Sequence, residues 1–291
     1  MKSGDISAIV GRFRPALWPF IWAHALAGFI AAHGKEALGL DAESWLQGLV
    51  AGGHWAVLLG GSAAALTAVF NGECGLQAAE RGASNAEPDS QLSVPTPRSA
   101  LRTPHLVFWA ALALLLIGLG TSPVLAWWYF DAYLIGVILV AAYAAPPLQL
   151  SGLRIGGIAA QAFGFGALTF YSGYAASNDP AFRAEFSPLY LIGFILLFVA
   201  LRLALKPPSA KWAFCLYWLF LAGAFGCLAA AEIRLGNRFG TALLIVPLAG
   251  WCVPGARGDR AQAEEPPLSL AAGLGLCLAT DAAVALTSLL R

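Results

Sequence analysis

Three side chains that could hold a metal ion follow the second apolar stretch of the chain. Glu73, Gln77 and Glu80 are spaced i, i+4 and i+7, so a helix continuing through them would place all three on one face. Carboxylate oxygens are ligands that Mg²⁺ accepts in proteins. Glutamine is a weaker ligand, however, and Glu80 can equally pair with Arg81 or with water. A solvated polar helix end is therefore the favoured interpretation, and a metal site at these residues is the alternative.

A second group of candidate binding residues is basic. The segment LRLALKPPSAKW, residues 201–212, contains no acidic residue. Its two lysines, together with two arginines elsewhere in the chain, could bind a phosphate group directly: Lys206, Lys211, Arg98 and Arg154. The favoured interpretation is that these cations set the topology of the chain and contact anionic lipid.

The elements that position these residues are predicted to be membrane-spanning helices. The chain is 59% hydrophobic and only 11% charged, which is too little charge to cover a water-facing surface. An apolar helix of about 20 residues spans a bilayer, and no segment shows the alternation of a barrel strand. The sequence predicts one all-helical domain over residues 1–291, with a long loop at 71–104. It contains nine candidate spans: 15–33, 46–70, 105–121, 124–145, 155–177, 188–206, 210–231, 239–255 and 268–290. The third and fourth spans meet at Thr121, Ser122 and Pro123, which predicts a tight helical hairpin there.

The distribution of basic residues predicts the orientation of these spans. With nine spans and a cytoplasmic N-terminus, twelve of the seventeen lysines and arginines face the cytoplasm, which satisfies the positive-inside rule. The loop at 71–104 is then cytoplasmic and the C-terminus is external. No cleavage site follows the first span, and no basic run indicates a nucleic-acid partner. We expect a multi-pass protein of the cytoplasmic membrane, if the source is bacterial.

Isolated polar residues within the spans carry less information. Asp131 lies close enough to the end of its span to reach the outer headgroups. Asp281 lies deeper, and either a structural hydrogen bond to a neighbouring helix or a position lining a polar cavity would explain it. The histidines do not have ligand spacing and the cysteines form no CxxC pair, so we expect neither a metal site nor a disulfide framework: His24, His33, His54, His105, Cys74, Cys215, Cys227, Cys252 and Cys277.

Several local patterns together resemble the UbiA superfamily of intramembrane prenyltransferases. Asn71 closes the second span and precedes a long polar loop with a proline-rich tail. The segment YAAPPLQLSGLRIGG, residues 143–157, ends the fourth span, and the opening FRPALWPFIWAHALAGFIAA is similar to the family's first helix. The resemblance covers residues 12 to about 177, and beyond them only the helix pattern is similar. It implies a UbiA-like bundle of nine helices.

The resemblance also implies a chemistry, from which this chain departs. Members of the family bind a prenyl diphosphate, and two aspartate-rich motifs hold the Mg²⁺ ions that help the diphosphate leave. In the family's first motif, an Asn is followed by an Asp four residues later and by another Asp eight residues later. In this chain Asn71 is followed at these positions by Gly75 and Ala79. The segment at the second motif carries no acid. Mg²⁺ is therefore expected only if Glu73 and Glu80 form a shifted site.

We expect an internal, mostly apolar cavity that opens toward the cytoplasmic loops, between the helices that the family uses to line its central cavity. Six residues on or beside these helices are expected near the cavity: Tyr143, Gln161, Gly164, Phe165, Gly166 and Tyr171. Ordinary helix packing is the alternative. The complete set of candidate substrate-binding residues is Asn71, Glu73, Gln77, Glu80, Arg98, Tyr143, Arg154, Gln161, Lys206 and Lys211. The sequence indicates no catalytic residue.

Three functions remain open from the sequence. The residues favour a non-catalytic, UbiA-like protein that binds an isoprenoid, quinone, pigment or lipid, as a subunit or assembly partner of a membrane complex. The first alternative is a prenyltransferase with an altered site that modifies an aromatic or tetrapyrrole acceptor. A transporter is the second, and the lack of clustered charge within the spans argues against it.

Overall fold

The fold is described from a computed structural model of the chain. The description covers residues 11–71, 102–146, 148–177, 186–205, 212–237, 240–257 and 269–290. Within these ranges every regular element is a helix: η1 (Pro15–Leu17), α2 (Trp18–His33), η2 (Gly34–Gly39), α3 (Ala42–His54), η3 (Trp55–Gly61), α5 (Arg102–Leu125), α6 (Trp127–Ala144), η4 (Leu150–Gly152), α7 (Arg154–Gln161), η5 (Ala162–Leu168), α8 (Thr169–Ala176), α10 (Pro188–Leu205), α11 (Trp212–Arg234), η6 (Gly240–Leu244), α12 (Ile245–Arg257) and α13 (Leu270–Leu289).

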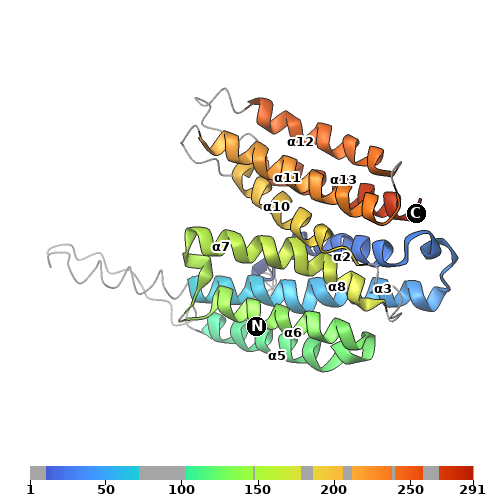
Figure 1. Cartoon of the computed structure of the whole chain (residues 1–291). Coiled ribbons are helices and arrows are strands. Elements are labelled where there is room, and N and C mark those ends of the chain that lie inside the picture. The colour runs from blue at the N-terminus through green and yellow to red at the C-terminus, as the bar shows by residue number, and fades with distance from the viewer. Residues whose placement is uncertain are drawn as a thin grey trace.

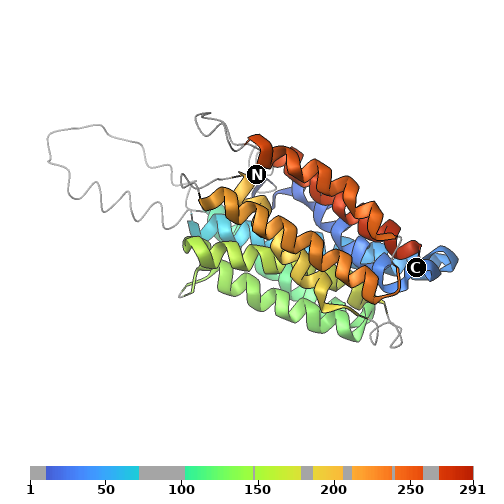
Figure 2. The ribbon, with the colours of Figure 1, turned by 45° about the horizontal axis from the view of Figure 1, so that its top comes forward.

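Several of these elements join into longer rods. α3 and η3 continue as helix to Asn71, and α7, η5 and α8 form one helix over Arg154–Ala176. The rods pack side by side in an elongated bundle, with α5 and α6 on one side and α11, α12 and α13 on the other (Figure 1). α2 packs against both α8 and α13, and so connects the two sides of the bundle. Figure 2 shows the same arrangement after rotation.

The apolar helices identify a multi-pass membrane protein. Seven helices of the described ranges are long and apolar enough to cross a bilayer: Pro15–Gly39, Ala42–Asn71, His105–Leu125, Trp127–Ala144, Pro188–Leu205, Cys215–Arg234 and Leu270–Leu289. Thr241–Cys252 is apolar but shorter. The prediction of an all-helical membrane protein is thus confirmed for the part of the chain that is described.

The hairpin between the third and fourth predicted spans lies further along the chain than expected. α5 continues through Pro123 to Leu125, and the chain reverses at Ala126, which has extended backbone dihedrals. Proline has no N–H group, so the Leu119 carbonyl loses its usual helical partner. The Ser122 hydroxyl donates to that carbonyl at 3.0 Å. This bond allows the helix to pass the proline, and the predicted turn at residues 121–123 was wrong.

Polar side chains connect the helix ends at the opposite end of the bundle from Asn71. Gln47 Nε2 donates to the carbonyls of Leu125 and Ala176 at 2.6 and 2.9 Å, and so joins α3 to the ends of α5 and α8. Asp41 begins α3 by accepting a hydrogen bond from the Ser44 N–H at 2.8 Å. The hydrogen bonds from Ser44 lower the pKa of the exposed Asp41 carboxyl. These contacts satisfy backbone groups that a helix leaves without partners at its termini.

Candidate ligand-binding cavity

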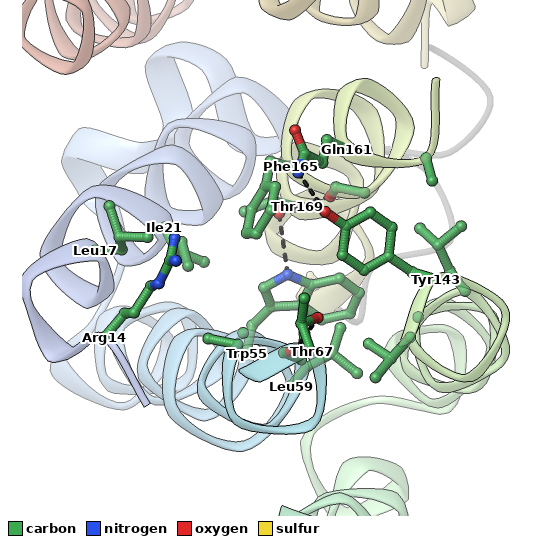
Figure 3. Close-up of a pocket in the computed structure, with 18 of the residues that line it drawn as sticks. Arg14, Leu17, Ile21, Trp55, Leu59, Thr67, Tyr143, Gln161, Phe165 and Thr169 are labelled. Carbon is green, nitrogen blue, oxygen red and sulfur yellow. Dashed lines mark hydrogen bonds between the residues drawn. The ribbon is translucent and has the colours of Figure 1, made fainter. Parts of the chain in front are cut away.

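A cavity of about 320 Å³ lies between four helical rods of the N-terminal half. Its walls come from η1 and α2, from the helix that runs through η3 to Asn71, from α6, and from α7 with η5. Its size falls at the lower end of the range of about 300–1,000 Å³ that is typical of small-molecule sites. Figure 3 shows Arg14, Leu17 and Ile21 on one side of this space and Tyr143 and Gln161 on the other.

Two π-helical segments form opposing parts of the cavity wall. η3 contributes Trp55 and Leu59, and η5 contributes Phe165 and Leu168. Trp55 Nε1 donates to the Thr169 hydroxyl at 3.1 Å and joins the two rods (Figure 3). Short π-helical segments within α-helices are frequent at functional sites. Both such segments of the described chain contribute residues to this cavity.

Most of the wall is apolar, and its polar groups include a pair between α6 and α7. The Gln161 amide donates to the Tyr143 hydroxyl at 2.5 Å, which leaves the Tyr143 O–H able to donate to a ligand. Thr67 donates instead to the Ala63 carbonyl on its own helix, at 2.7 Å. The cavity can thus surround an apolar molecule and offer hydrogen bonds at one part of its wall.

A cation lies at the exposed end of the cavity. Arg14 and Asn71 both line it and both are exposed, so the cavity opens at the end of the bundle where the long loop begins. Of the described residues that line the cavity, Arg14 alone carries a charge, and no described residue forms an ion pair with it. Its φ of 48° is uncommon for a residue with a side chain. Such backbone strain is concentrated at ligand sites and turns.

The structure brings some of the predicted site residues together. Asn71, Tyr143 and Gln161 line the same cavity, with Phe165 and Gly164 beside them. The helix α7, whose first residue is Arg154, starts at the same end of the bundle (Figure 1). Six candidates lie outside the described residues: Glu73, Gln77, Glu80, Arg98, Lys206 and Lys211.

Two residues expected near the cavity lie elsewhere. Tyr171 packs its ring against Phe186, at 5.5 Å between ring centroids. A Cβ atom on Gly166 would lie 2.8 Å from the Phe194 carbonyl oxygen, so this glycine faces α10. The cause is the helical rotation between positions 164 and 171, which turns part of this rod away from the cavity.

Sequence reasoning missed two buried polar positions, His24 and Glu232, and the role of one exposed cation, Arg14. The sequence indicated only that His24 has no metal-ligand spacing, whereas in the structure its Nδ1 lies 2.6 Å from Oδ1 of Asp281. For Asp281 this supports the structural hydrogen bond, and Asp281 does not line the cavity. Glu232, just beyond the predicted end of its span at 231, is fully buried and accepts from the Tyr190 hydroxyl at 2.5 Å. Arg14, which entered the sequence-based prediction only as one of the twelve cytoplasmic basic residues, lines the cavity. No local pattern reports such long-range partners.

Among the residues described, no group of three or more His, Cys, Asp or Glu side chains could hold a metal ion. The shifted Mg²⁺ site at Glu73 and Glu80 lies outside them and stays a prediction.

Comparison with family models, curated proteins and solved structures gives no match for this chain.

Proposed function

We propose that this chain is a diverged, UbiA-like membrane protein that holds an isoprenoid or a similar lipid-like ligand in the cavity, without catalysing prenyl transfer. The observation that carries the proposal is an apolar cavity between helices with a cation, Arg14, at its open end that forms no ion pair with any described residue. An elongated apolar ligand with a polar or anionic head matches this distribution. Its tail would contact η3, η5 and α6, and its head would lie beside Arg14 and Asn71.

The proposal includes nine crossings of the bilayer. Two rods accompany the seven long apolar helices: Arg154–Ala176 and the shorter segment Thr241–Cys252. Nine successive crossings agree with the predicted excess of basic residues on the cytoplasmic side. The resemblance of residues 12 to 177 to the UbiA superfamily provides a second argument, because the cavity lies within that part of the chain.

Filling the cavity should strongly reduce ligand retention. Ala68 lines the cavity, and in Ala68→Phe a benzyl group would occupy space that the ligand needs. We expect wild-type protein, purified gently in detergent, to carry an isoprenoid-class molecule that mass spectrometry identifies. Its occupancy should fall at least about tenfold in Ala68→Phe, which requires a loss of at least about 1.4 kcal/mol of binding free energy.

Ala113→Phe is the matched control. Ala113 lies on an exposed face of α5 and does not line the cavity, so the same substitution there should leave the bound molecule in place. Thermal unfolding of both variants checks that each remains folded. Equal occupancy in folded Ala68→Phe and wild-type protein would contradict the proposal, as would wild-type protein that retains only bulk phospholipid.

The orientation of the chain can be tested by cysteine labelling of intact cells. In a variant without native cysteines, Leu38→Cys should react with a membrane-impermeant maleimide added outside. Leu38 lies in η2, at the end of the apolar helix Pro15–Gly39, and is 74% exposed. Ser90→Cys should react only after the cells are permeabilised, because the loop at 71–104 is predicted to be cytoplasmic. The reverse pattern would invert the proposed topology.

A further inference from the structure

Two buried titratable side chains from distant parts of the chain are in contact inside the bundle. His24 on α2 and Asp281 on α13 are 257 positions apart, yet Nδ1 of the histidine lies 2.6 Å from Oδ1 of the aspartate. The other ring nitrogen, Nε2, lies 2.8 Å from the Gly166 carbonyl oxygen in η5. The two side chains are almost fully buried, so water does not compete for these contacts.

The geometry determines how many protons this pair holds. A carbonyl oxygen can only accept a hydrogen bond, so His24 Nε2 carries a hydrogen. The contact between Nδ1 and Oδ1 also requires a hydrogen, because two lone pairs would repel at this distance. That hydrogen belongs either to an imidazolium facing a carboxylate or to a carboxylic acid facing a neutral imidazole. Both arrangements hold the same two protons and carry no net charge.

The surroundings favour retention of both protons. Aromatic rings from α8 and α10 surround the imidazole: Phe170, Phe194 and Phe198. Among the described residues, the other titratable group beside Asp281 is the Cys277 thiol, one turn earlier on α13 and also buried. The second carboxylate oxygen of Asp281, Oδ2, is buried and has no hydrogen-bond partner among the described residues. Loss of the shared proton would place a net negative charge in apolar surroundings, which is strongly unfavourable.

We infer that His24 and Asp281 form a proton-binding site inside the bundle, which keeps one shared proton and joins α13 and α2 to η5. Gly166 follows Phe165, which lines the cavity, so the site lies directly behind the cavity wall. The inference does not depend on what the cavity binds.

The number of protons can be measured by comparing wild type with Asp281→Asn. The asparagine amide can donate to Nδ1 while Nε2–H still donates to Gly166, so the folded variant holds one proton fewer. Above about pH 5 the unfolded chains bind equal numbers of protons, because an exposed aspartate is ionised there. Wild-type folding therefore takes up one more proton than folding of the variant. The stability of wild type relative to the variant therefore decreases as pH rises. The folding constant of wild type divided by that of the variant should fall about tenfold per pH unit.

The measurement is reversible unfolding of the full chain in mixed micelles at several pH values between about 5.5 and 8. Proton binding by the other titratable groups affects both proteins equally and cancels in the ratio of their folding constants. A ratio that is constant with pH would overturn the inference, since the folded pair would then hold a single proton.

Nitrogen NMR of histidine-labelled wild-type protein provides a second test, which does not require the variant to fold. The His24 signals are assigned by their loss in His24→Gln, and free imidazole in the same sample reports titration. We expect hydrogen-bonded signals from both ring nitrogens that stay constant over the same pH range. A signal typical of a nitrogen lone pair without a hydrogen bond, or a titration that follows free imidazole, would overturn the inference.

Discussion

Gly173→Ala is expected to force α2 and α8 apart and to lower the free energy of unfolding by about 3 kcal/mol or more. A Cβ atom at this position would lie 1.6 Å from the Ala25 carbonyl oxygen on α2. A Cβ atom on Gly28 would likewise lie 1.9 Å from the Phe170 carbonyl oxygen on α8. Each glycine thus faces the backbone of the other helix, which cannot move aside as a flexible side chain can. Small residues permit this close approach in membranes.

Gly226→Ala is the matched control for this prediction. Gly226 lies within α11, and a Cβ atom there would meet no atom within 4 Å. Alanine has the higher helix propensity, by about 1 kcal/mol, so this variant should be as stable as wild type or slightly more stable. Unfolding in detergent, followed by circular dichroism, measures both variants. If Gly173→Ala were as stable as Gly226→Ala, the close packing of α2 and α8 would be wrong.

His24→Leu is expected to destabilise the protein by about 3–5 kcal/mol, because it leaves the Asp281 carboxyl buried without its partner. The substitution also removes the hydrogen bond to Gly166, the link between α2 and the π-helical segment η5. The loss should be largest at neutral and higher pH, where a lone carboxylate must be protonated to remain in the bundle. Reversible unfolding in mixed micelles measures it.

The double variant His24→Leu/Asp281→Leu separates an unpaired charge from simple loss of contacts. Apolar residues in place of both partners remove the buried charge, and such replacements are often close to neutral. We therefore expect the double variant to recover most of the stability that His24→Leu loses. A double variant less stable than either single variant would show that packing shape, and not charge, determines the effect.

The sequence by itself determined the helical membrane character of this protein. Hydrophobic length is a local property, since a run of about 20 apolar residues satisfies its own backbone hydrogen bonds as a helix. The apolar helices described here therefore occur close to where the sequence predicts spans. The sequence also indicated part of the cavity wall, because Tyr143 near the end of α6 and Gln161 in α7 lie on helices that follow each other along the chain. The family resemblance stays a proposal, and six of the candidate site residues lie outside the described ranges.

Only the tertiary structure determined which distant groups meet. The pairing of His24 with Asp281 depends on how α2, α13 and η5 are rotated about their axes, and composition carries no information on rotation. The same is true of Gly28 and Gly173, whose importance comes from the backbone that each one faces. The end of α5 likewise depends on whether another group satisfies the carbonyl that Pro123 leaves without a partner. Local sequence sets which segments become helices, whereas contacts between their faces decide which polar groups are buried together and where the cavity opens.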